Sequence, residues 1–135
     1  MDRSFQINYE ALGEIVSDYE LDIRDRVSNL QNIAYAARLL NDTAAELKIR
    51  SIGIRCDDVI NKLNDTLRMI EKLDPKEGQS RFNQIDNEFD SIDAAVENTA
   101  TILEARLRIR GHSIDINRKI SRAAIGAGLL YYFTR

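Results

Sequence analysis

The chain has 135 residues, of which 44% are apolar and 30% charged, and this size and balance favour one folded domain over 1–135 and argue against a disordered chain. One proline and no tryptophan are more typical of an all-α protein than of a β-sandwich. A single cysteine, Cys56, excludes an internal disulfide, and the first residues lack the basic start and apolar core of a leader peptide. We therefore expect a cytoplasmic protein, or one that is secreted without a leader.

The net charge of −3 conceals a gradient along the chain. Residues 1–100 carry 12 basic and 20 acidic side chains, whereas residues 101–135 carry seven basic and two acidic ones. Such a gradient can be satisfied internally, with segments of opposite charge lying side by side, or externally, with the basic end offered to an acidic surface. The internal arrangement is favoured, because a compact fold brings the two halves together.

Residues 7–40 are predicted to form the first long helix. Apolar side chains recur there at steps of three and four, interrupted only by Arg26. The members of this row are Tyr9, Leu12, Val16, Tyr19, Ile23, Leu30, Ile33, Ala37 and Leu40. A seam of this kind is stable only against other helices, so packing of helix on helix is expected.

A second apolar row, in a different phase, predicts another helix over 43–73. A turn at 41–43 explains the change of phase: Asn41 tolerates the left-handed conformation of a helix stop, and Thr43 with Glu46 has capping-box spacing. A single helix bent near Gly53 is the alternative.

The only proline, Pro75, marks the next boundary together with Gly78 and Ser80, and it predicts a third helix over 81–110. Three helices of similar length with short connections are typical of an antiparallel bundle. A shorter apolar helix is predicted over 114–134, after a stop at Gly111.

The last segment is unusual, because every residue from Ala123 to Phe133 is apolar or glycine. Eleven such residues are too few to cross a bilayer, so the segment is expected in a core, against a partner, or on a membrane surface. The predicted contact residues are the apolar ones, with basic residues before them to steer an acidic partner or anionic lipid. They are Ala123, Ile125, Ala127, Leu129, Leu130, Tyr131, Phe133, Arg118, Lys119 and Arg122.

Catalytic chemistry is not indicated. One histidine, His112, and one cysteine cannot supply a zinc site or a paired Glu-x-x-His site, and Cys56 lies on the second apolar row, where a small buried residue is expected. We predict no catalytic, cofactor or metal residues. Nucleic acid is an unfavoured partner because the acidic part of the chain would oppose it.

The third helix contains a repeat of one pentapeptide pattern. Phe82 precedes Asp86 by four residues, and Phe89 precedes Asp93 by four. Acidic residues nearby have calcium-loop spacing, but Ser91 occupies the position that needs glycine, so a helix is predicted instead. The pattern resembles the Y/F-x-x-x-D/E signal of WXG100-like proteins of type VII secretion, and this resemblance implies an accessory or substrate role, with Phe82, Asp86, Phe89 and Asp93 as signal residues.

The sequence as a whole predicts a non-enzymatic adaptor that self-associates or docks a protein partner through its seams and its C-terminal helix. A peripheral protein held on an anionic membrane surface by that helix is the first alternative. A type VII secretion protein is the second.

Overall fold

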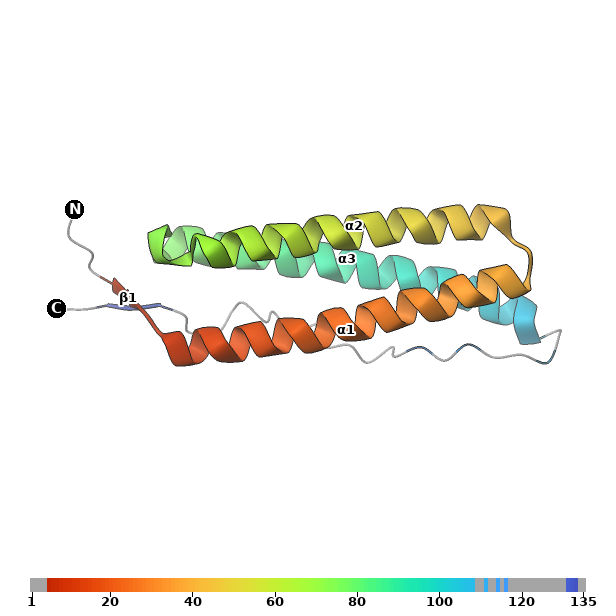
Figure 1. Cartoon of the computed structure of the whole chain (residues 1–135), viewed down its shortest axis with the longest axis horizontal. Coiled ribbons are helices and arrows are strands. Elements are labelled where there is room, and N and C mark those ends of the chain that lie inside the picture. Colours follow the sequence, from red (N-terminus) through yellow and green to blue (C-terminus); the bar gives the residue numbers. More distant parts are fainter. Residues whose placement is uncertain (1–4, 109–110, 112–113, 115, 117–130, 134–135) are drawn as a thin grey trace.

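The computed structural model describes residues 5–108, 111, 114, 116 and 131–133. Three long helices lie side by side, and each contacts the other two: α1 (Tyr9–Leu39), α2 (Thr43–Arg68) and α3 (Pro75–Arg108) (Figure 1). A short 3-10 helix, η1 (Ile70–Lys72), links α2 to α3. Two short strands, β1 (Phe5–Ile7) and β2 (Tyr131–Phe133), pair with each other. The predicted helical class is confirmed.

The direction of the helices follows from their side-chain pairs. Tyr19 bonds to Asp86 and Arg26 bonds to Asp93, so one heptad along α1 corresponds to one heptad along α3. A constant offset of this kind requires that α1 and α3 run in the same direction. The chain returns through α2, which starts where α1 ends and runs the opposite way (Figure 1).

A Schellman turn ends α1. Asn41 has a φ of 52° and donates its N–H to the carbonyl of Arg38, and Asp42 donates its N–H to the carbonyl of Ala37 at 3.0 Å. Asp42 then caps α2, because its Oδ1 accepts the N–H of Ala45 at 3.0 Å. Asn41 thus ends α1, and Asp42 is the N-cap of α2.

The predicted break at 41–43 is confirmed, and the alternative of one bent helix is wrong, since Gly53 lies inside α2. The predicted capping box of Thr43 and Glu46 is also wrong. The side chain of Asp42, one residue earlier, satisfies the first amides of the helix, so Thr43 is the first helical residue rather than the cap.

α3 begins six residues earlier than predicted. Pro75 is its first residue, where a missing N–H costs nothing and the fixed φ suits a helix. Asp74 caps it by accepting the N–H of Glu77 at 2.7 Å, while its carbonyl accepts the N–H of Gly78. The proline that was interpreted as a break is therefore the start of the helix. The helix predicted over 43–73 is shorter, because α2 ends at Arg68 before η1.

The helix predicted over 114–134 is wrong where the structure describes that segment. Ile114 and Ile116 are not helical, and Tyr131–Phe133 form β2, antiparallel to β1. A helix over 114–134 would advance only about 30 Å, whereas α1, with 31 residues, is about 46 Å long. Such a helix would be too short to bring Tyr131 to Ile7, the residue of β1 with which it pairs at the start of α1. Residues 117–130 lie outside the described residues.

The core lies between the three helices. Tyr19 packs on Phe82 and Phe89, with ring centroids 6.2 and 6.3 Å apart. Ile33 and Leu103 are also buried, with exposed fractions of 0% and 1%. Apolar burial of this extent is the main force that holds the helices together, at about 25 cal/mol per Å² removed from water.

Candidate interaction sites

The inward face of α1 is polar in its middle, which the sequence analysis did not predict. Asp22, Arg26 and Asn29 are buried, with exposed fractions of 9%, 2% and 5%. The predicted row of apolar residues had Arg26 as its single interruption. Tyr19, Ile33, Ala37 and Leu40 of the predicted row are buried as expected. The second position of the heptad differs, because Asp22 and Asn29 lie inside the fold in place of Ile23 and Leu30.

Arg26 and Asp93 form a buried, two-pronged ion pair between α1 and α3. Nε donates to Oδ1 and Nη2 donates to Oδ2, both at 2.8 Å, and the two side chains are 3% and 6% exposed. The guanidinium carbon also lies 4.2 Å from the centroid of the Phe89 ring, a cation–π contact. This geometry fixes the register of the two helices, because a slide by one residue would break both hydrogen bonds.

A second polar bond lies one heptad away. The Tyr19 hydroxyl donates to Oδ1 of Asp86 at 2.6 Å in the core. The two pentapeptides singled out in the sequence thus have a structural role: their aromatic residues, Phe82 and Phe89, are 0% and 2% exposed, and their aspartates bind α1. Periodicity brought the four residues together on one face of α3, but their partners on α1 were not predicted.

Asp22 is the least satisfied member of the polar group. Its Oδ2 is buried and has no hydrogen-bond partner among the described residues, and the same is true of Nη1 of Arg26, one turn away. Burial raises the pKa of the Asp22 carboxyl; Arg26 opposes the shift, and the negative charges of Asp25 and Asp93 add to it. Three carboxylates, those of Asp22, Asp25 and Asp93, therefore lie around the single guanidinium of Arg26.

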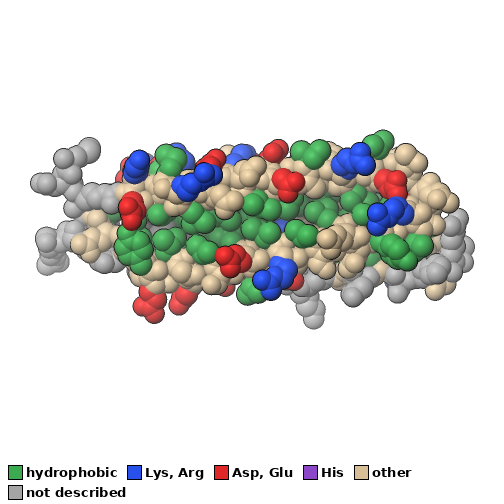
Figure 2. All heavy atoms as spheres, in the orientation of Figure 1, with side chains coloured by type: hydrophobic (Ala, Val, Ile, Leu, Met, Phe, Trp, Pro, Cys, Tyr) green, Lys and Arg blue, Asp and Glu red, His purple; other side chains and the backbone are tan. Residues whose placement is uncertain are grey.

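A partly buried apolar surface lies on the other flank of α1. It contains much of the row that the sequence predicted to be core, and Val27 within it is 41% exposed. On α2, Ile60 and Leu67 are one heptad apart on the same face of the helix and are also only partly buried. We call this surface the apolar α1–α2 face: Leu12, Val16, Ile23, Val27, Leu30, Ala34, Ile60 and Leu67. Figure 2 shows the apolar strip between α2 and α1, bordered by charged side chains.

One end of this face is a shallow depression between the two helices. Ala34 and Arg38 of α1 line it with Glu46, Ile49 and Arg50 of α2. The depression confirms that these flanks of α1 and α2 open onto the same surface. Its rim carries both signs of charge, as in the polar rim of a protein–protein interface.

Most of the predicted contact residues of the C-terminal segment lie outside the described residues: Arg118, Lys119, Arg122, Ala123, Ile125, Ala127, Leu129 and Leu130. Tyr131 and Phe133 lie in β2, where their backbones pair with Ile7 and Phe5. The role of this segment in contacting a partner stays a prediction.

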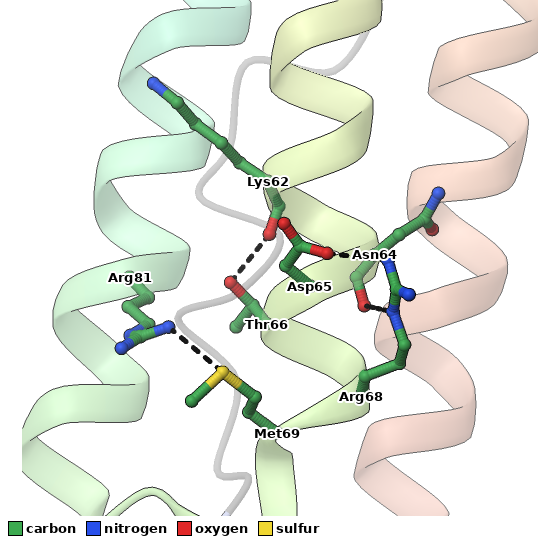
Figure 3. A network of polar contacts seen from close by, with 7 residues as sticks. All are labelled: Lys62, Asn64, Asp65, Thr66, Arg68, Met69 and Arg81. Carbon is green, nitrogen blue, oxygen red and sulfur yellow. Dashed lines mark hydrogen bonds and ion pairs between the residues drawn. The ribbon is translucent and has the colours of Figure 1, made fainter.

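Further polar contacts lie on the surface. At the end of α2, Arg68 binds Asp65 at 2.6 Å, and Arg81 of α3 reaches the sulfur of Met69 (Figure 3). An open polar hollow on the α2–α3 side includes Arg55 and Asn83 in its lining. These exposed groups are solvated and contribute little to stability.

Cys56 is buried, with an exposed fraction of 2%, as predicted, and burial raises the pKa of its thiol. Within the described ranges, no group of three potential ligands is placed to hold a metal ion. A search of the same residues finds no helix with the length and apolarity needed to cross a bilayer.

Comparison with known protein families, curated proteins and solved structures gave no match.

Proposed function

We propose that this protein is a non-enzymatic helical interaction protein that self-associates, and that the apolar α1–α2 face is its contact surface. The observation that carries the proposal is an inversion on α1. The apolar side chains of Ile23 and Leu30 are only partly buried and Val27 is 41% exposed, while the polar side chains of Asp22 and Arg26 are buried. Such a departure from the usual pattern is expected where an apolar surface serves a second partner.

The size of the face suits a second copy of the chain. α2 has 26 residues and is about 39 Å long, and two packed helices are about 20 Å wide. The outline of the two helices therefore covers about 800 Å², which is the area that each partner contributes to a standard specific interface. Two such helical pairs related by a two-fold axis would place four helices around a shared core. The mixed charges of Arg38, Glu46 and Arg50 on the rim allow opposite charges to meet in that arrangement.

The test is the mass of the full chain in solution, measured by sedimentation velocity between about 1 and 200 µM. The proposal expects a dimer, twice the 15.4-kDa chain mass, that dissociates on dilution. Val27→Glu would place a charge at the centre of the face and should give a monomer. The control is Ile54→Glu, which changes a residue of α2 that is 57% exposed and not part of the apolar α1–α2 face, and it should leave the dimer intact.

A monomer at every concentration would overturn self-association through this face. Equal loss of dimer in Val27→Glu and Ile54→Glu would overturn the choice of surface. The membrane-surface and secretion alternatives stay predictions, since the basic and apolar residues on which the membrane alternative depends lie outside the described residues.

A further inference from the structure

The apolar α1–α2 face is unevenly divided between its two helices. α1 contributes apolar side chains along most of its length, because the residues of the face from Leu12 to Ala34 belong to it. On α2, the row that borders the face recurs at steps of seven: Glu46, Gly53, Ile60 and Leu67. The first half of this row carries a charge and a glycine, and only its second half is apolar. The flank of α1 is therefore the part of the face that most needs an apolar partner.

Two symmetric arrangements bring this face against the same face of a second copy. A two-fold axis parallel to the helices sets α1 against α2 of the second copy, with like ends of the helices together. A two-fold axis perpendicular to the helices sets α1 against α1 and α2 against α2, with opposite ends together. The first arrangement places Ala34 opposite Glu46, since both residues line the same end of the face. Only the second arrangement places the apolar flank of α1 on an equally apolar flank.

The two ends of the face differ in charge. The depression at the end near the α1–α2 turn is lined by two arginines and one glutamate: Arg38, Arg50 and Glu46. The opposite end presents two glutamates, because Glu71 accepts a hydrogen bond from the Tyr9 hydroxyl at 2.8 Å and Glu10 follows Tyr9 in the first turn of α1. Glu10 and Arg38 are separated by four heptads, so they lie on the same flank of α1. Opposite charges therefore meet at both ends of α1 only if the second copy points the other way.

We propose that the second copy docks in the opposite direction, with α1 against α1 and with Arg38 of each copy beside Glu10 of the other. This arrangement rests on the self-association proposed for the face and specifies how the two copies meet. The two-fold axis crosses α1 near its middle, at Arg24, where Asp57 lies at the same level of α2. The Arg24 and Asp57 side chains of both copies carry equal and opposite charges around the axis, so the centre is neutral. With like ends together, Glu10 instead meets Glu71 of the second copy.

Chemical cross-linking of single-cysteine chains tests the direction. The background is Cys56→Ala, and sedimentation velocity checks that this chain still forms the dimer. Ser17 and Gln31 are exposed on α1, one heptad to either side of Arg24. A chain with Ser17→Cys and a chain with Gln31→Cys, mixed and treated with a short bismaleimide, should therefore give a covalent heterodimer. Like ends together would instead bring Ser17 level with the exposed Asn64 of α2, so a chain with Asn64→Cys is the competing partner in a second mixture.

Charge reversal, in chains that keep Cys56, is the second measurement. In Arg38→Glu both ends of the α1 flank are acidic, and in Glu10→Arg both are basic, so each variant alone should dimerise at least about fivefold more weakly than the wild type. Mixed together, the two variants bring opposite charges into contact at both ends and should form a heterodimer with a Kd near that of the wild-type dimer. The matched control is Lys48→Glu, which makes the same charge change on the side of α2 that contacts α3. This control should dimerise like the wild type and show no preference for Glu10→Arg.

A dimer that lacks the cross-link between Ser17→Cys and Gln31→Cys would overturn the opposite direction and leave self-association intact, and a link to Asn64→Cys would show that like ends meet. A mixture of Arg38→Glu and Glu10→Arg that associates no better than either variant alone would equally overturn it. A wild-type chain that is monomeric at every concentration would overturn both this arrangement and the proposed self-association.

Discussion

The buried pair of Arg26 and Asp93 provides the sharpest test of the packing. Asp93→Ala removes a carboxylate that accepts two hydrogen bonds at 2.8 Å and leaves the guanidinium 2% exposed and unneutralised. Breaking one side of a buried pair costs about 3–5 kcal/mol, because the remaining charge stays out of water. Arg26→Met should cost a similar amount, since Asp93 and the neighbouring Asp22 would both lose their cation.

Replacing both partners should behave differently. In Arg26→Met with Asp93→Leu no unpaired charge of the pair remains buried, and Asp22 is the carboxylate left without its cation. In an Asp22→Asn background the free energy of unfolding of the double variant should therefore lie within about 1 kcal/mol of that of the Asp22→Asn chain. The single changes would together suggest a loss of about 6–10 kcal/mol, so the coupling should be at least about 5 kcal/mol. Urea unfolding followed by far-ultraviolet circular dichroism measures all four chains.

These four chains form a double-mutant cycle. The cycle should be measured both in the wild-type background and in an Asp22→Asn background, which separates the contribution of Asp22 from that of the pair. A cost below about 1 kcal/mol for Asp93→Ala would refute the reasoning, because that value is typical of a solvated surface pair. Additive effects of the two single changes would show that Arg26 and Asp93 do not act as a unit.

Three further changes test other elements of the fold. Tyr19→Phe should cost about 1.5–3 kcal/mol in urea unfolding, because Asp86 loses a 2.6 Å hydrogen bond in the core; no loss would mean that Asp86 is satisfied without the hydroxyl. Asn41→Ala should lower the free energy of unfolding by about 1–2 kcal/mol, because an alanine at a φ of 52° is strained. The control Asn41→Gly should not destabilise the protein. Equal losses in both variants would show that the positive φ is not the cause of the loss. Asp42→Asn should retain the cap but remove an acid-dependent part of stability. The Ala45 N–H, with Arg106, holds the pKa of Asp42 below its ordinary value of 3.8, so its contribution is present above that pH and is lost as pH falls through the folded-state pKa. The two chains should therefore differ at pH 6 and converge near pH 2, and a constant difference would contradict this assignment.

Local sequence signals were sufficient for much of the secondary structure. Asn41 marked the end of α1 because its residue type tolerates a positive φ, and the apolar period of 49–63 marked the inward face of α2. Pro75 was misread because proline fits both a break and the first turn of a helix. Asp74 decided between the two, and its role depends on a hydrogen bond to Glu77.

The sequence by itself determined that this protein is helical and that Phe82, Asp86, Phe89 and Asp93 share one side of α3, because helical periodicity is a local property of the chain. Only the tertiary structure decided which flank of α1 turns inward. On Tyr9–Leu39 the buried Tyr19 and Arg26 lie opposite Asp86 and Asp93, on a helix 67 residues away in sequence. These contacts turn Asp22 and Asn29 inward and leave Ile23 and Leu30 only partly buried. The pairing of Phe5–Ile7 with Tyr131–Phe133 was likewise beyond local reasoning, since a strand is stable only with a partner and that partner lies at the other end of the chain.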